Sequence, residues 1–466
     1  MTAMPDSGDD PQHQRFIEEA LKTCAEERIH QIGTIQPAGV LMAVDEASLD
    51  IVMASGNLEE LFGIAASDAL GRPLASLIGA DQAMTFRDLA SQESWPGSLI
   101  CAVSLAHRGK DTPYDVHVFR ADGRIVIEIE KDPPLEGDAF HRQFIPIRDA
   151  LWKLDAEQDM HRYSQAVVDE VRLLSGYDRV MMYRFDQQWD GEVIAESLVD
   201  GAQSYLGNHF PASDIPAQAR DLYTRNLVRL IVDVAGSSVP ILAASPDRPP
   251  LDLSLSWLRS MSPVHVQYLR NMGVRASLSI SLVQNNRLWG LIACHHFAPK
   301  YVPLRAREMD EFIGRMVSLK LSNMENAERS RLQDQIRTLL QRLTESIRKT
   351  RDLDAVVQSY QDDFLSLVRA TGAVISIAGN RHNFGQTLPE ETLEQLFATL
   401  RTLPPAPVYC TDSLADLLPL AEHERDVASG LMVAPLDQVM RDFVLWLRPG
   451  ILRTLRWAGR PEKLVV

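Results

Sequence analysis

The sequence predicts an α+β protein of three tandem domains, each an antiparallel sheet with flanking helices, and a long helix that connects the second domain to the third. The chain has 466 residues, which is enough for about three domains of ordinary size. Pairs of alternating apolar and polar segments flank short turns, as in antiparallel hairpins. Between Gly314 and Gly372 there is neither glycine nor proline, which favours the long helix.

Composition argues against several classes of protein. Hydrophobic residues make up 45% of the chain and charged residues 24%, which is the balance of a globular protein. The net charge of −16 opposes non-specific binding to nucleic acid or anionic lipid, and no apolar run reaches the roughly 18–20 residues of a membrane span. The four cysteines are far apart and show no metal-ligand spacing, so we expect free thiols, no metal and a cytoplasmic location.

The first domain is predicted over residues 1–133. Residues 38–44 and 51–54 flank a turn of Asp, Glu and Ser residues and predict a hairpin. Residues 123–130 predict a later strand. The segment 131–137 contains two prolines and is a candidate linker.

The second domain is predicted over residues 134–322. It begins with one helix over residues 149–174. Its strands are expected at residues 177–185, 191–198, 276–283 and 287–295. The last two strands flank Gln284-Asn285-Asn286 and form the clearest hairpin pattern of the chain.

The third domain, residues 323–466, begins within the long helix, for which we expect one break near Leu353. Apolar residues at helical spacing, among them Ile336 and Leu340, form a stripe that is either a helical dimer interface or packed against its own domain. The chain ends with the apolar residues 463–466, a strand end with no returning partner, so we expect this domain to be incomplete.

Cys24 is a candidate reactive thiol. It follows a helical pattern and precedes residues 29–39, so it lies on a lead-in segment from which it could reach another domain. A structural thiol more often lies in an apolar run, as Cys294 does. Glu26 and Glu27 would not favour a thiolate, which usually has a cationic neighbour. On these residues alone, both a reactive and a passive role stay open.

Asp214 lies in the segment Ser213-Asp214-Ile215-Pro216, whose residue types are those of a helix start. One interpretation makes Asp214 a helix cap. The other makes it a pocket residue, because Phe210 and Tyr223 place aromatic side chains around it.

His265 and His295 lie at the ends of predicted elements, where a histidine is either a core residue or a ligand contact. Cys294 and His295 are neighbours on one strand and therefore point to opposite faces. They cannot form a nucleophile-base pair, and we predict no catalytic residues.

Arg229 and Arg259 lie in apolar surroundings, where an arginine needs an anionic partner. The carboxylates of a ligand are one possible partner. Asp233 and Asp252 are the other.

Several segments together resemble the photosensory module of bacterial, biliverdin-binding phytochromes, and the resemblance covers essentially the whole chain. The region of Cys24 with Ile35-Gln36-Pro37-Ala38-Gly39 is similar to the beginning of the family's PAS domain. Residues 210–219, 259–273 and 288–296 resemble its GAF chromophore pocket, and the region of Trp446 and Trp457 resembles the start of the PHY tongue hairpin. The resemblance implies PAS over 1–133, GAF over 134–322, and PHY over 323–466 without the returning tongue strand.

The resemblance also implies biliverdin IXα as the cofactor. Cys24 matches the cysteine that forms a thioether with a vinyl group of the A ring, and Val264 stands where plant-type members carry a cysteine. The carbonyl of Asp214 and the ring of His265 match acceptors for the pyrrole N–H groups, and His295 matches the partner of the D-ring carbonyl. The propionate-binding set is matched by Arg229, Arg259, Ser262, Ser277 and Ser279. The surroundings of the D ring are matched by Met181, Tyr183, Phe210, Ile215, Tyr223 and Tyr268, with Pro216 in the same motif.

By this resemblance the chain is a red/far-red light photoreceptor whose signal begins with Z/E isomerisation of the double bond between rings C and D. The family acts as homodimers with a histidine kinase or another output domain. The resemblance implies no enzymatic turnover beyond self-attachment of the bilin. The alternative is a light-independent PAS/GAF small-ligand sensor or dimerisation module, since fold does not determine the ligand.

Overall fold

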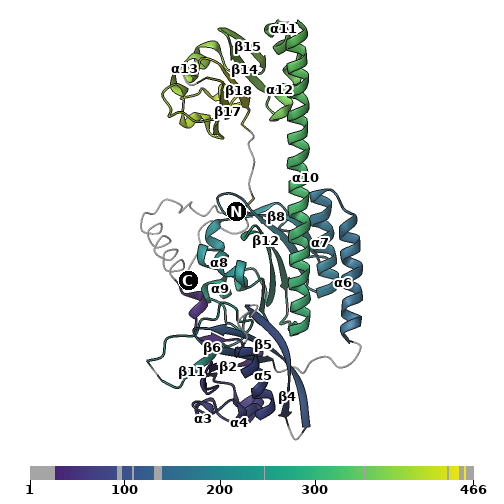
Figure 1. Cartoon of the computed structure of the whole chain (residues 1–466), viewed down its shortest axis with the longest axis vertical. Helices are drawn as coiled ribbons and strands as arrows, with labels where there is room; N and C mark the ends of the chain where they lie inside the picture. Colours follow the sequence, from purple (N-terminus) through teal and green to yellow (C-terminus); the bar gives the residue numbers. More distant parts are fainter. Residues whose placement is uncertain are drawn as a thin grey trace, which may run out of the picture. The chain divides into compact units, whose positions relative to one another are not determined.

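The structure is a computed structural model and describes residues 27–91, 97–107, 110–130, 139–245, 247–350, 352–437, 440–450 and 456–457. The chain divides into two compact units, one of Met1–Met324 with Leu455–Val466 and one of Glu325–Thr454. The described residues contain three sheets whose neighbouring strands pair antiparallel, apart from one parallel pair (Figure 1). The predicted α+β class is therefore confirmed.

The first sheet has seven strands in the order β1-β11-β3-β2-β6-β5-β4. They are β1 (Thr34–Ile35), β2 (Gly39–Asp45), β3 (Ile51–Ser55), β4 (Ser98–His107), β5 (Lys110–Ala121), β6 (Arg124–Glu130) and β11 (Val239–Ala243). The expected hairpin is the β2–β3 pair, and the later strand is β6. Buried apolar residues of the sheet pack on the helices α2 (Glu59–Phe62), α3 (Ala66–Ala69), α4 (Ala75–Ile78) and α5 (Ala80–Ser91).

One strand of this sheet, β11, comes from the second sequence block. It pairs with β1 on one side and β3 on the other. The segment 29–36, which contains the short 3₁₀ helix η1 (Ile29–Gln31), is also bonded to residues 253–260: Leu253 N–H donates to His30 O at 2.7 Å and Ser260 N–H donates to Thr34 O at 3.1 Å. The two sequence blocks are thus interwoven through residues 228–260.

The second sheet also has seven strands, in the order β10-β12-β13-β7-β8-β9-β19. They are β7 (Arg179–Phe185), β8 (Gly191–Leu198), β9 (Asn208–Phe210), β10 (Val228–Ile231), β12 (Ala276–Gln284), β13 (Arg287–His296) and β19 (Arg456–Trp457). The four strands expected here are confirmed, and both turn residues Asn285 and Asn286 have positive φ, as the tight hairpin turn requires.

The two faces of the second sheet differ. One face packs on α6 (Ala139–Ala156), α7 (Met160–Ser175) and the first turns of α10 (Leu304–Thr350), with Val180, Val167 and Val317 among the buried contacts. The opposite side carries α8 (Ala217–Arg225) and α9 (Pro263–Asn271), as Figure 1 shows. Alternate residues of each central strand therefore meet different partners.

The single helix expected over residues 149–174 is wrong. The structure has two helices, α6 and α7, separated by residues 157–159. Asp159 is the N-cap of α7, and its carboxylate accepts the N–H of Arg162 at 3.0 Å. An N-cap takes non-helical backbone angles, so it ends one helical run and begins another. The candidate linker at 131–137 lies outside the described residues.

The long helix and its break are confirmed. α10 begins at Leu304, before Gly314, and ends at Thr350. Asp352 then caps α11 (Leu353–Ser359) by accepting the N–H of Ala355 at 3.1 Å. Gly314 lies in the helix because its close packing on the sheet leaves no room for a side chain, since a Cβ there would lie 2.5 Å from Ile280.

The second unit holds a five-stranded sheet in the order β15-β14-β18-β17-β16. Its strands are β14 (Gly372–Ile377), β15 (Asn380–Gly385), β16 (Tyr409–Thr411), β17 (Gly430–Pro435) and β18 (Phe443–Arg448). Its helical elements are α11, α12 (Gln361–Leu367), α13 (Glu390–Leu400), η3 (Leu414–Asp416) and α14 (Glu422–Arg425). Buried residues of α13 pack on one face of the sheet.

Gly290→Ala tests the close approach of β13 to β7. A Cβ at this position would lie 2.2 Å from the carbonyl oxygen of Tyr183, so one strand must shift. We expect the free energy of unfolding, measured with urea, to fall by about 2 kcal/mol. Gly97→Ala is the matched control, because its Cβ would meet only Leu255 at 3.7 Å. Equal stability of the two variants would contradict this packing.

Candidate functional site

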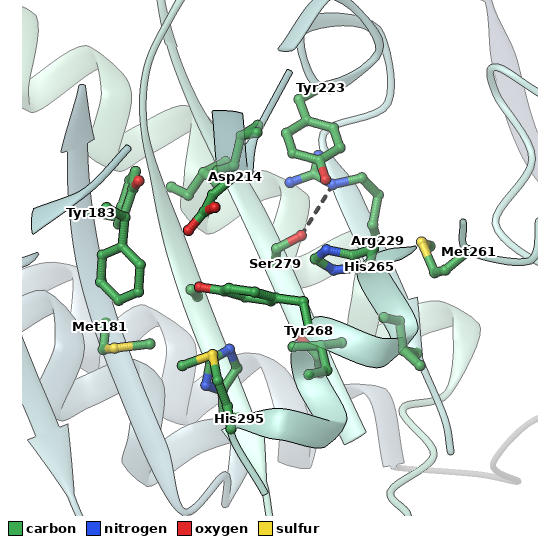
Figure 2. Close-up of a pocket in the computed structure, with 18 residues that line it drawn as sticks. Met181, Tyr183, Asp214, Tyr223, Arg229, Met261, His265, Tyr268, Ser279 and His295 are labelled. Carbon is green, nitrogen blue, oxygen red and sulfur yellow. Dashed lines mark hydrogen bonds between the residues drawn. The ribbon is translucent and has the colours of Figure 1, made fainter. Parts of the chain in front are cut away.

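A cavity lies between the second sheet and the helices α8 and α9, and about 800 Å³ of space between its walls, part of it open to solvent, is free of protein atoms. Figure 2 shows its polar and aromatic side chains converging on one space. The lining residues are Met181, Tyr183, Phe210, Asp214, Ile215, Tyr223, Arg229, Ile231, Met261, His265, Tyr268, Leu269, Met272, Ser277, Ser279, Leu291, Ala293 and His295.

Strand alternation supplies the floor of the cavity. Odd-numbered residues of β7, β12 and β13 line it, for example Tyr183, Ser279 and His295. The residues between them point to the opposite face of the sheet, and Cys294 lies there in the apolar core. As predicted, Cys294 and His295 are thus on different faces.

Helix α9 supplies one wall through residues at i, i+3, i+4 and i+7, which share a helix face. These residues are His265, Tyr268, Leu269 and Met272. The rings of His265 and Tyr268 lie nearly parallel, with centroids 6.0 Å apart. Both residues were candidate site residues in the sequence.

Asp214 enters the cavity from the short 3₁₀ helix η2 (Ala212–Asp214), and the interpretation that it caps a helix is wrong. The N-cap of α8 is Pro216 instead. The Asp214 carboxylate is hydrogen-bonded to the Tyr268 hydroxyl, and burial together with this negative charge raises the pKa of Tyr268. The Arg220 guanidinium holds the next backbone carbonyl, that of Ile215, at 2.6 Å.

Arg229 is a positively charged residue of the cavity wall and is only 6% exposed. It donates to Ser279 Oγ at 3.0 Å, Ser281 Oγ at 2.7 Å and Asn226 O at 2.6 Å. Its guanidinium stacks on Tyr223 at 3.7 Å. Burial lowers the pKa of Arg229 to about 10. Its Nη2 has no hydrogen-bond partner among the described residues.

The two aspartates considered as partners of the arginines have other contacts. Asp233 pairs with Arg275 at 3.0 Å, and Asp252 accepts the N–H of Ser254 at 2.8 Å. Among the described residues, neither Arg229 nor Arg259 forms a salt bridge that would satisfy a buried charge. That alternative is therefore wrong.

Three predicted site residues lie beside the cavity rather than in its wall. Pro216 begins α8. Arg259 is 3% exposed and donates to Ile29 O at 3.0 Å. Ser262 donates to Glu27 Oε2 at 2.6 Å.

Cys24 lies outside the described residues, which begin at Glu27. The contact between Glu27 and Ser262 nevertheless places a residue three positions after Cys24 next to the N-cap of α9.

Several lining residues were missed in the sequence: Ile231, Met261, Leu269, Met272, Leu291 and Ala293. The signal was present for most of them. Leu291 and Ala293 precede His295 at spacing two along one strand, and Leu269 and Met272 extend the helix face of His265.

Groups of three or more metal-ligand side chains do not occur within the described ranges. His295 is buried, and burial with the charges of Arg179 and His265 lowers its pKa to about 3. Its imidazole is therefore neutral near pH 7, with one N–H donor and one acceptor. Its Nδ1 lacks a hydrogen-bond partner within the described part of the chain.

Among the helices that the structure describes, none combines the length and apolarity of a membrane span.

Three family profiles match the chain. The profile for the PAS fold matches residues 24–132, the GAF domain profile residues 159–320, and the phytochrome region profile residues 336–465.

Curated relatives match over nearly the whole chain. Cyanobacterial phytochrome B of Nostoc is 37% identical over 447 residues, covering 96% of this chain and 60% of the relative. A bacteriophytochrome of Xanthomonas campestris is 31% identical over 458 residues, covering 95% of this chain and 71% of the relative. Two further cyanobacterial relatives are covered over 57% and 58% of their length, so the chain spans somewhat more than half of these proteins.

Solved structures agree. The bacteriophytochrome RpBphP3 from R. palustris has a TM-score of 0.84 and 32% identity, over 94% of this chain and 88% of that one. The phytochrome photosensory core module of Stigmatella aurantiaca has a TM-score of 0.83 and 37% identity, with the same coverage of 94% and 88%.

His295→Gln tests the burial of a neutral imidazole. Since the folded pKa is about 3 and the unfolded value about 6.5, the unfolded chain takes up the proton first as pH falls. Stability is therefore complete above pH 6.5 and is lost towards pH 3. We expect the wild type to lose about 2 kcal/mol more than His295→Gln between pH 7 and pH 5, measured by urea unfolding. His161→Gln, at an exposed site on α7, should behave like the wild type.

Proposed function

The chain belongs to the phytochrome family as a PAS-GAF-PHY photosensory module, and on that premise we propose that it is a red/far-red photoreceptor that binds biliverdin IXα covalently through Cys24. We assign the PAS domain to residues 1–133, the GAF domain to 134–322 and the PHY domain to 323–466. The output partner in this proposal is a histidine kinase or another signalling domain, acting in the cytoplasm.

The observation that carries the proposal is buried Arg229, which has no carboxylate partner in the described part of the chain. Burying a guanidinium without a charged partner is expensive, and a ligand carboxylate would provide that partner. The free Nη2 of Arg229 and the hydroxyls of Ser277 and Ser279 all lie in one part of the cavity wall. They fit the propionate side chains of a bilin.

The other groups of the cavity fit the pyrrole part of the same ligand. The carbonyl of Asp214 and the ring of His265 are acceptors suited to N–H donors. The neutral imidazole of His295 is suited to the carbonyl of the last ring, and Met181 and Tyr183 would surround that ring. A bound biliverdin would supply the light absorption and the double bond that isomerises.

The protein's part in signalling is to hold one packing in the dark and to accept another after illumination. Tyr268 donates to Asp214 and stacks on His265, so displacement of the last ring would disturb a hydrogen bond in the same wall. Strand β9 belongs to the same sheet as the cavity floor, and its residues Asn208 and His209 pair in parallel with β19. This pairing gives the third sequence block a direct contact with the cavity's neighbourhood.

The choice of biliverdin over other bilins depends on where the thiol is. Val264 is in the first turn of α9, so this helix presents no thiol to the pigment there. Cys24 precedes Glu27, which contacts Ser262 at the start of the same helix.

Cys24→Ala tests the attachment. After incubation with biliverdin, we expect the wild type to keep a red-absorbing band in acid urea, and the variant to lose it under denaturation because no thioether forms. Cys410→Ala removes an exposed thiol and should keep the covalent band. A covalent pigment in Cys24→Ala would disprove the attachment, and a wild type that stays colourless would disprove the photoreceptor function.

We also propose a homodimer through α10. Phe312, Met316 and Leu319 lie at i, i+4 and i+7 on one face of this helix and are 41%, 38% and 55% exposed. A row of exposed apolar side chains on a helix favours a helical interface.

Leu319→Glu tests the dimer. A charge in the apolar row should convert the dimer into a monomer at micromolar concentration, measured by light scattering, because the carboxylate would be desolvated in the interface. Met84→Glu, which changes an exposed apolar residue of α5 that is 49% exposed, should remain dimeric. A monomeric wild type would refute the dimer.

A further inference from the structure

Glu128 is a buried carboxylate of β6 whose partners lie in the other sequence block. It is only 1% exposed. Its oxygens accept the N–H of Trp257 at 2.9 Å, the N–H of Leu258 at 3.2 Å and the hydroxyl of Ser256. From its own sheet, His117 Nδ1 lies 2.8 Å away. A carboxylate with this many donors fixes the loop that supplies them.

The loop held by Glu128 carries Arg259. The Ser256 hydroxyl donates to Glu128 and at the same time accepts the backbone N–H of Arg259 at 2.9 Å. A hydroxyl can do both, so Ser256 links the carboxylate to the arginine backbone by two consecutive hydrogen bonds.

A second side chain of the first block, that of Gln36, is hydrogen-bonded to the backbone around β10, the strand that carries Arg229. Gln36 Nε2 donates to Leu230 O at 2.7 Å, and Gln36 Oε1 accepts the N–H of Val232 at 3.0 Å. Leu230 is the residue after Arg229 on β10, and Val232 directly follows this strand. Both arginines next to Tyr223 therefore have backbones tied to the first sheet's block.

We propose that Glu128 is a positioning residue for carboxylate recognition: through Ser256 it holds the Arg259 loop, so that Arg259, which lies beside the cavity wall, adds its positive charge to that of Arg229 in the recognition of the ligand's anionic side chains. This inference rests on the proposed bilin-binding function and adds to it a role for the first domain. That domain shapes the pocket's charge selectivity without contributing a lining side chain of its own sheet.

The electrostatics agree with this role. Burial alone would raise the pKa of Glu128, but the hydrogen bonds from His117, Ser256 and Trp257 outweigh it and leave the pKa below its usual value. Glu128 is thus ionised near pH 7. Its negative charge is also among the interactions that favour the charged form of Arg259.

Glu130 provides a matched control on the same strand. It is two residues further along the face of β6 and is 3% exposed. Its carboxylate pairs with Arg307 of α10, not with the loop 256–259. Removing the charge of Glu130 should destabilise the contact between β6 and α10 without changing the position of Arg259.

The test compares two pigments, biliverdin and biliverdin dimethyl ester, whose propionates carry no charge. Binding is measured by absorption titration in a Cys24→Ser background, where no thioether forms and the equilibrium constants are defined. We expect this reference protein to prefer the free acid. Glu128→Gln should reduce the ratio of the two dissociation constants about tenfold, because one oxygen that accepts loop N–H groups becomes a donor.

Two further variants keep the test decisive. Ser256→Ala removes the link to Arg259 N–H, while Glu128 keeps its hydrogen bonds from the N–H groups of Trp257 and Leu258. This variant should reduce the preference in the same direction, even if Glu128→Gln folds poorly. Glu130→Gln should lose about as much thermal stability as Glu128→Gln but should keep the preference for the free acid over the ester.

The outcomes separate the inference from the function on which it rests. An equal loss of affinity for acid and ester in Glu128→Gln and Ser256→Ala, or no change in either, would overturn the positioning role while bilin binding stands. A reference protein that binds neither pigment would refute the proposed function, and the positioning role with it.

Discussion

The constraint on which the rest of the site depends is a buried guanidinium that meets no carboxylate among the residues that the structure describes. Arg229 is held by two serine hydroxyls, one backbone carbonyl and the ring of Tyr223. Neutral acceptors compensate part of its desolvation but leave the charge without a counter-ion. Such a group is costly in an empty apolar cavity and favourable beside an anionic ligand, so the wall is complementary to a carboxylate.

The two-faced sheet explains how this polar cavity exists in a stable domain. One face of β7, β12 and β13 packs on α6, α7 and α10 as a continuous apolar core. That core leaves the opposite face free to carry histidine, serine and arginine side chains. Because side chains alternate along a strand, each added polar residue on the cavity side costs nothing in the core on the other side.

The interweaving of the first two sequence blocks gives the cavity a rigid frame. β11 lies between β1 and β3, and residues 253–260 bond to the segment 29–36. The loop that leads into α9 is therefore held by backbone pairing and by the buried Glu128 together. A ligand that contacts α9 is coupled mechanically to the first sheet through these bonds.

Local sequence patterns determined the hairpins β2–β3 and β12–β13 and the long helix with its break before Leu353, because periods of two and 3.6 residues reflect which face is buried. Most of the cavity residues were predicted from the resemblance to the phytochrome family. Only the tertiary structure decided that β11 joins the first sheet, that Asp159 splits one helical pattern into two, and that Asp214 faces the cavity instead of capping a helix. These features depend on partners distant in sequence: Ser256 and Glu128 are 128 positions apart. A hydrogen bond across that separation leaves no periodic trace in either segment, so its existence depends on how the two blocks pack.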